Sequence, residues 1–148
     1  MRKINIKDIA EESWTSPKGK FGGASKEISV ALGRKPLSRD LNERHPFDIE
    51  ICRIPPGKSH CPYHSHSAQW EFYHVISGKG IVRHADGTTS IEAGDAFIFG
   101  PGEAHQLSND ARSHTRAFLA GTFQFSSWAR RKIRGAATYN NAEQAFLY

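Results

Sequence analysis

The sequence predicts an all-β fold, a sandwich or barrel built from short strands. In several short runs apolar residues alternate with polar ones, and turns rich in Gly, Pro and Asp separate these runs. No segment has the 3.6-residue period of an amphipathic helix. The chain has 148 residues, of which 38% are hydrophobic and 24% charged, as expected for one globular domain.

Alternation and turn residues together predict where the strands lie. Pro55 and Pro56 end one run, because proline cannot donate a hydrogen bond to a sheet. Asp86-Gly87 is typical of the tight turn of a hairpin. Residues 16–23 have turn-forming residues at five of eight positions and are predicted as a loop. The expected strands are 26–32, 47–54, 69–76, 79–84, 89–92, 96–99 and 117–125.

Four side chains indicate a metal site. His64 and His66 are two residues apart, so on an extended backbone both imidazoles leave the same face. Glu71 lies in the next strand-like run, and His105 follows a Gly-Pro-Gly turn. Imidazoles and a carboxylate that converge on one point suit a borderline divalent metal such as Zn, Fe, Mn, Ni or Cu. His60 is an alternative ligand, but it lies four residues before His64, and this spacing suits a shared site less well than that of His64 and His66.

The first of these stretches resembles the first motif of the cupin superfamily. That motif is a Gly, a short gap, His-x-His, three or four residues, Glu, six residues and Gly. Here Gly57, His64, His66, Glu71 and Gly78 match it, with a gap after Gly57 that is one residue longer than usual.

The second motif of the superfamily is matched as well. It consists of Gly, five residues, Pro-x-Gly, two residues, His, three residues and Asn. Gly94, Gly102, His105 and Asn109 match, while Gly100 stands where the first Pro is expected. The resemblance covers roughly residues 47–109.

The resemblance implies a cupin-type jelly-roll β-barrel, or double-sheet sandwich. We expect an N-terminal arm with a short strand over residues 1–46, the barrel over 47–125 and a basic C-terminal tail over 126–148. The arm is expected to cover the outside of the barrel or a neighbouring subunit.

Alternation through the run 69–76 separates an inner from an outer face. If Glu71 binds metal it points inward, and Tyr73 shares its face. Tyr73 is the candidate for contacting a substrate; packing in the barrel, with its hydroxyl bonded internally, is the alternative. Aromatic residues on the outer face indicate a cover, either the arm or a second subunit of a homodimer. The other inward residues are Gln69 and Val75, and the outward residues are Trp70, Phe72 and His74.

The distribution of charge argues against a specific nucleic-acid interface. The net charge is +5, but residues 1–111 contain 14 basic and 14 acidic residues. The excess lies in residues 112–148, where a basic tail can touch phosphates nonspecifically. No run of about 18 apolar residues predicts a membrane span, and the N-terminus lacks the apolar stretch of a signal peptide. We therefore expect a cytoplasmic protein in which Cys52 and Cys61 are reduced thiols.

Several functions remain open within the resemblance. It implies isomerases, epimerases, dioxygenases, decarboxylases and binding or sensing domains. The leading expectation is a cupin that holds one divalent transition metal (Zn, Mn, Fe or Ni) and binds a polar small molecule, as a sugar (phosphate) isomerase-like enzyme would. The alternatives are an iron-dependent dioxygenase and a non-catalytic binding or sensing module. Whether the protein is an enzyme stays open, and the motifs identify no catalytic acid or base.

Overall fold

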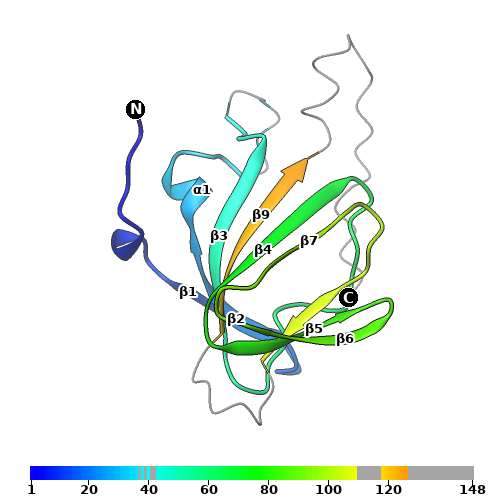
Figure 1. Ribbon diagram of the computed structural model, residues 1–148. Coiled ribbons are helices and arrows are strands. Elements are labelled where there is room, and N and C mark those ends of the chain that lie inside the picture. Colours follow the sequence, from blue (N-terminus) through cyan, green and yellow to red (C-terminus); the bar gives the residue numbers. More distant parts are fainter. Residues whose placement is uncertain (37, 39, 41–42, 110–117, 127–148) are drawn as a thin grey trace.

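The computed structural model describes residues 1–36, 38, 40 and 43–109, and the backbone of 118–126. These residues form two antiparallel sheets with two short helices, so the all-β prediction is confirmed (Figure 1). No helix in these ranges has the length and apolar character to cross a membrane. In chain order the elements are η1 (Ile6–Asp8), β1 (Glu12–Thr15), β2 (Gly22–Glu27), α1 (Ile28–Ala31), β3 (Phe47–Ile54), β4 (Gln69–Ser77), β5 (Lys79–His84), β6 (Gly87–Glu92), β7 (Ala96–Phe99), β8 (Gln106–Ser108) and β9 (Phe118–Ser126).

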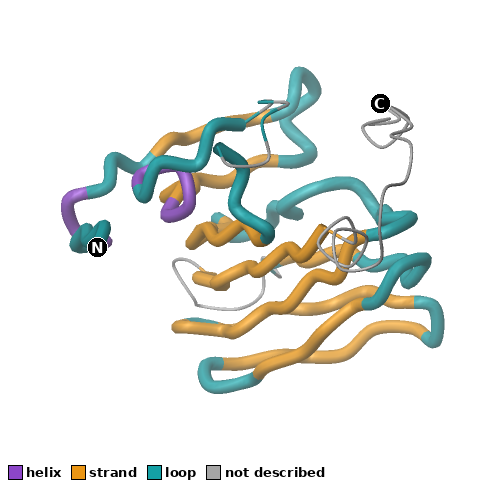
Figure 2. The backbone as a smooth tube through the Cα atoms, turned by 90° about the horizontal axis from the view of Figure 1, so that it is seen from above, coloured by secondary structure: helices purple, strands orange, loops and turns teal. Residues whose placement is uncertain are grey.

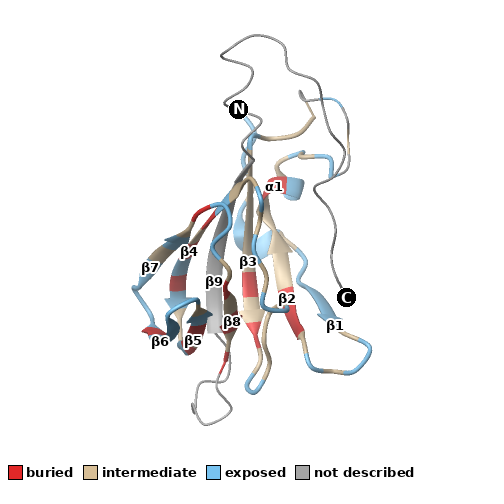
Figure 3. Ribbon diagram, turned by 90° about the vertical axis from the view of Figure 1, so that its right-hand side faces the viewer, coloured by how far each residue is buried: buried red, intermediate tan, exposed pale blue. Residues whose placement is uncertain are grey.

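The two sheets face each other across one apolar core. The larger has the strand order β1-β2-β3-β9-β4-β7, and the smaller has the order β6-β5-β8. Figures 2 and 3 show the same layers from above and from the side. The larger sheet contributes Cys52, Ile54, Tyr73 and Val75 to the core, and the smaller contributes Val82, Ile91 and Leu107.

Strand β4 alternates as the sequence predicts. Glu71, Tyr73 and Val75 are buried, whereas Trp70 and Ile76 are 39% and 43% exposed. The inner face of β4 therefore carries the candidate metal ligand Glu71, with an aromatic and an aliphatic residue behind it.

The region before β3 differs from the prediction in one element. The strand expected over 26–32 is wrong beyond Glu27, where β2 ends, because α1 begins at Ile28. Ile28 and Leu32, four residues apart, are both half-buried, as one turn of helix allows. The hydroxyl of Ser29, which is 1% exposed, accepts a hydrogen bond of 2.8 Å from the amide of Ile49 at the start of β3. Three alternating apolar residues fit either structure, and this contact favours the helix.

The predicted loop 16–23 also ends earlier than expected, because Gly22 and Gly23 belong to β2 and are buried. A Cβ atom on Gly23 would lie 2.8 Å from the carbonyl oxygen of Arg53 on β3. Glycine is therefore needed here for close approach of two strands rather than for a turn.

Predictions for the hairpin, the last strand and the cysteines are confirmed, whereas the division of the chain is not tested. The hairpin at Asp86 is confirmed, with β5 and β6 paired through His84 and Gly87. The strand expected over 117–125 is confirmed as β9, between β3 and β4. Cys52 and Cys61 are free, as expected. The division into arm, barrel and tail stays a prediction, and residues 127–148 of the tail lie outside the described residues.

Asn109, the last residue of the second motif, joins the two sheets near β8. It is 1% exposed, and its side-chain amide donates a hydrogen bond of 2.8 Å to the carbonyl oxygen of Ile54. Its backbone carbonyl accepts a hydrogen bond from the amide of Gly57, and its own amide donates to Lys58.

We expect Asn109→Ala to lower the free energy of unfolding by about 1–3 kcal/mol, because a buried hydrogen bond is lost. Urea unfolding followed by tryptophan fluorescence measures this. Ser108→Ala, at the half-buried neighbouring position, is the matched control and should lose less. Equal stability of the two variants would show that the side chain of Asn109 does not stabilise the fold.

Candidate metal centre

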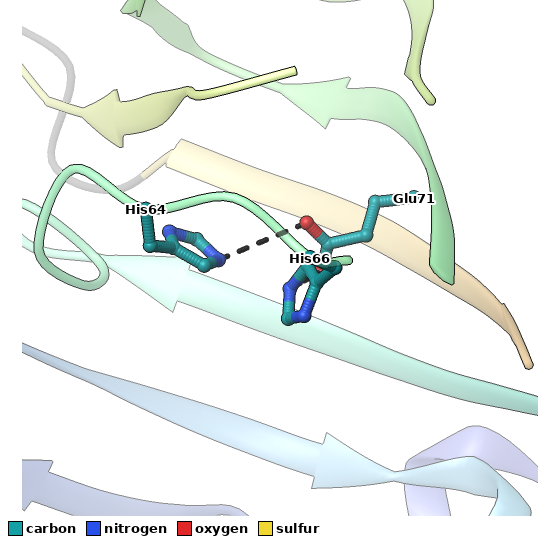
Figure 4. A group of neighbouring side chains, drawn as sticks. All are labelled: His64, His66 and Glu71. Carbon is teal, nitrogen blue, oxygen red and sulfur yellow. Dashed lines mark ion pairs between the residues drawn. The ribbon is translucent and has the colours of Figure 1, made fainter. Parts of the chain in front are cut away.

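The structure brings three of the four predicted ligands into one cluster. His64 and His66 come from the loop before β4, and Glu71 comes from β4 itself. One potential ligand atom of each lies within 4.8 Å of the other two (Figure 4). The Nε2 atom of His66 is 3.2 Å from Oε1 of Glu71, and Nε2 of His64 is 3.8 Å from Oε2.

His105 reaches the same carboxylate from the segment before β8. Its Nε2 atom lies 2.7 Å from Oε2 of Glu71, and its ring centroid lies 4.8 Å from that of His64. Two backbone hydrogen bonds of 3.1 and 2.8 Å join His64 to His105, which fixes the spacing of their segments. Phe99 of β7 stacks on the His105 ring at 4.0 Å between centroids. The three imidazoles named from the sequence therefore converge on the carboxylate of the fourth residue, Glu71.

Backbone carbonyl groups orient two of the imidazoles. The Nδ1 atom of His64 lies 3.0 Å from the carbonyl oxygen of Pro62, and Nδ1 of His105 lies 3.0 Å from that of Glu103. A carbonyl oxygen can only accept, so we assign the proton of each neutral ring to Nδ1. The lone pair is then on Nε2, the atom that faces Glu71. This is the tautomer a metal ligand requires, and a carbonyl on the other nitrogen is the usual support of such a ligand.

The carboxylate at the centre keeps its charge. Burial by itself would raise the pKa of Glu71, but His105 and His66, which donate to the carboxylate whenever Nε2 carries a proton, hold this pKa well below its usual range. The hydrogen bond to Glu71 raises the pKa of His66. Burial lowers the pKa of His64, which favours its neutral form.

Tyr73 combines packing with a place at the cluster. Its ring stacks on Phe97, 5.2 Å between centroids, and its hydroxyl lies 3.2 Å from Nε2 of His105. Burial first, and then the charge of Glu71, raise the pKa of Tyr73 well above its ordinary value. The hydroxyl therefore stays protonated and can donate a hydrogen bond. Contact with a substrate stays a prediction.

His60 does not join the cluster, in agreement with its poorer spacing. Its Nε2 atom lies 3.8 Å from Oε1 of Glu50, and its ring packs edge-on against Trp14. The prediction from sequence missed Glu50 as a neighbour of the site. Alternation along β3 could have found it, because Cys52 lies two residues further on the same face and is fully buried.

Cys61 is a second residue that the prediction missed. Its sulfur lies 3.4 Å from Nδ1 of His64. Burial, with smaller effects from the charges of Glu71 and Glu50, raises the pKa of this thiol to about 12. Cys61 is therefore an uncharged neighbour of the cluster rather than a thiolate ligand.

Comparisons with known proteins agree with the fold. The family model for the cupin domain matches residues 50–120. An oxalate-binding protein of Thermotoga maritima is 32% identical over 68 residues, which are 46% of this chain. The match spans 54% of the length of that relative.

Solved structures extend the likeness over most of the chain. A candidate sugar phosphate isomerase of Acidithiobacillus ferrooxidans superimposes with a TM-score of 0.66 and 25% identity, covering 81% of this chain and 70% of that one. A sugar phosphate isomerase of the cupin superfamily from Silicibacter pomeroyi has a TM-score of 0.65 and 20% identity, covering 83% and 74%, and shows the fold alone. Both motifs and the two facing sheets agree with the family model, so residues 50–120 of this chain form a cupin domain.

Proposed function

We propose that this protein holds a divalent transition metal at His64, His66, Glu71 and His105 and acts on a polar small molecule as a sugar isomerase would. One observation supports the metal most directly. With its proton on Nδ1, the His105 imidazole turns an acceptor nitrogen toward a carboxylate oxygen 2.7 Å away. Two acceptors at this distance repel unless a cation or an additional proton lies between them.

The donor set restricts which cation fits. Three imidazole nitrogens and one carboxylate oxygen suit Zn, Mn, Fe or Ni, whereas Ca and Mg prefer oxygen ligands. Such a metal would supply Lewis acidity toward a carbonyl group. The site is reachable, since the side chains of His64 and His66 are 28% and 25% exposed.

The residues of the chain have separate tasks in this proposal. Glu71, buried and charged, holds the imidazoles in one orientation. Tyr73 presents a protonated hydroxyl beside His105 and would donate a hydrogen bond to an oxygen of the substrate. Phe97 and Phe99 pack against Tyr73 and His105, which keeps water from that side of the site.

The likeness to the protein from A. ferrooxidans supports an isomerase, and the relative from T. maritima supports a second candidate. That relative is an oxalate-binding protein, which favours a binding module without turnover. An iron-dependent dioxygenase uses the same types of donor, imidazole and carboxylate, and is distinguished by its consumption of O2.

The metal is tested by its stoichiometry. We expect purified protein to contain about one transition metal ion per chain, and His64→Ala combined with His66→Ala to lose it, because two of four ligands are removed. Elemental analysis after dialysis measures this. His84→Ala, on the exposed hairpin of β5 and β6, is the control and should retain the metal. Full occupancy in the double variant would refute the ligand assignment.

Turnover is tested by proton exchange. Protein loaded with Mn²⁺ or Zn²⁺ is incubated with aldoses in ²H₂O, and NMR follows deuterium entry beside the carbonyl carbon. We expect Tyr73→Phe to lower kcat/KM about tenfold or more with unchanged metal content, because one hydrogen-bond donor is lost. Phe97→Leu, which disturbs the stack but keeps the hydroxyl, is the control.

Three other results would change the proposal. Uptake of O2 by the Fe²⁺-loaded protein would favour the dioxygenase. Tight binding of a small molecule without exchange would favour the binding module. Equal activity of Tyr73→Phe and the unaltered protein would remove Tyr73 from the substrate site.

We also propose that the protein is a cytoplasmic homodimer. Trp70 and Ile76 of β4 and Ile98 of β7 lie on the outer face of the larger sheet and are 39%, 43% and 54% exposed. Such an apolar face is typical of an interface. The free thiols Cys52 and Cys61 favour a reducing compartment.

The dimer is tested with Ile98→Asp. Placing a charge on the apolar face should shift the protein toward the monomer, because the carboxylate would lose its water in the interface. Light scattering at micromolar concentration measures the mass. Thr88→Asp, exposed on the hairpin of β5 and β6, is the control and should leave the mass unchanged. A monomeric unaltered protein would contradict the proposal.

A further inference from the structure

The loop that carries His64 runs along β8, the edge strand of the smaller sheet. The amide of His60 donates a hydrogen bond of 3.0 Å to the carbonyl oxygen of Leu107, and His64 exchanges two hydrogen bonds with His105. From His60 to His64 the loop takes four residue steps, whereas β8 takes two from Leu107 to His105. Residues 61–63 therefore bulge away from the strand.

This bulge determines the surroundings of the His64 ring. The carbonyl oxygen of Pro62 lies 3.0 Å from Nδ1 of His64, and the sulfur of Cys61 lies 3.4 Å from the same atom. Proline has no amide hydrogen, so Pro62 cannot be held by a hydrogen bond that its own nitrogen donates. The position of its carbonyl group, and with it the tautomer of His64, therefore depends on the contacts that hold its neighbours.

Arg83 and Gln106 lie on the outer face of the smaller sheet. Val82 and Leu107, which precede and follow them in β5 and β8, are buried in the core, so Arg83 and Gln106 point the other way. The two residues are directly opposite each other in the antiparallel register, which makes their side chains neighbours on that face.

Both side chains contact the bulge. The side-chain amide of Gln106 donates a hydrogen bond of 2.7 Å to the carbonyl oxygen of Cys61. The guanidinium group of Arg83 lies over the ring of Tyr63, 4.4 Å from its centroid, and a cation in this position is attracted by the aromatic face. The residue before Pro62 and the residue after it are therefore both held from the smaller sheet.

We propose that Arg83 and Gln106 are positioning residues for the candidate metal centre. By holding the residues on both sides of Pro62, they keep its carbonyl group where it accepts a hydrogen bond from Nδ1 of His64. The lone pair on Nε2 of His64 is then directed toward the metal. This inference rests on the metal site proposed above, and it adds two residues that act through the loop rather than as ligands.

The test replaces both side chains by apolar ones of similar length, in Arg83→Met combined with Gln106→Met. Competition with a chromophoric chelator measures the affinity for Zn²⁺. Proton–nitrogen NMR of the metal-free protein at about pH 8, where ordinary histidines are neutral, measures the tautomer of His64. We expect the zinc affinity to fall about tenfold, as the loss of one hydrogen bond and one exposed cation–π contact allows. Part of the His64 population should then carry its proton on Nε2.

The loss of charge alone predicts the opposite change. Removing the cation of Arg83 lowers the repulsion of a divalent metal, so weaker binding reports the geometry of the loop. The single variant Arg83→Lys, which keeps a cation beside Tyr63, should retain most of the affinity. Lys79→Met removes a cation from the same face of β5, where Lys79 pairs with Glu92, and is the matched control. It should lower neither the affinity nor the share of the Nδ1 tautomer.

Unchanged zinc affinity or an unchanged His64 tautomer in the double variant would overturn the inference. A lower melting temperature with both unchanged would give Arg83 and Gln106 a structural role alone. If the double variant does not fold, Tyr63→Leu, at an exposed position of the loop, repeats both measurements. Unaltered protein that binds no zinc would instead overturn the proposed function. The tautomer of His64 in the metal-free protein would still decide whether the two residues position its ring.

Discussion

The buried carboxylate of Glu71 is the constraint to which the rest of the site is adjusted. It is 3% exposed, yet contacts with His105 and His66 keep it charged. An isolated carboxylate in such a position would take up a proton rather than remain ionised. The surrounding imidazoles therefore have to be held firmly. The backbone bonds between His64 and His105, and the carbonyl groups on their Nδ1 atoms, provide this support.

The inward-facing residues of β3 and β4 are polar at one end of each strand and apolar at the other. On β4 the inner residues proceed from Glu71 through Tyr73 to Val75, and on β3 the buried Cys52 follows Glu50. Both strands pair with β9 and run in the same direction. Their apolar ends meet in the core, where the smaller sheet covers them, and their polar ends meet beside the histidines. One end of the sandwich therefore stabilises the fold while the other is left free for chemistry.

Sequence periodicity predicts most of this arrangement because strand geometry is local. The alternation of β4 places Glu71 and Tyr73 on one face without any tertiary information, and the role of Glu71 as a candidate ligand indicates that this face is the inner one. The predictions from periodicity are wrong where a contact between segments far apart in the sequence determines the local structure. The hydroxyl of Ser29 reaches β3, which favours a helical turn over a strand, and Gly23 belongs to a strand because Arg53 approaches it. Alternation along β3 places Glu50 on the face of Cys52, but its alignment with Tyr73 depends on the register of β3, β9 and β4, which no single segment encodes.

The same periodicity links the site to the outer surface. Any residue that faces inward on β4 has neighbours that face outward, so the strand presenting Glu71 and Tyr73 also presents Trp70 to solvent. A slip of one residue would place Trp70 among the imidazoles and Glu71 outside. The core contact of Val75 and the bulge after it oppose such a slip. An apolar partner on the outer face would oppose the slip further, because Trp70 would have to leave that partner. Association of two subunits would then stabilise the same register of β4 that places Glu71 in the site.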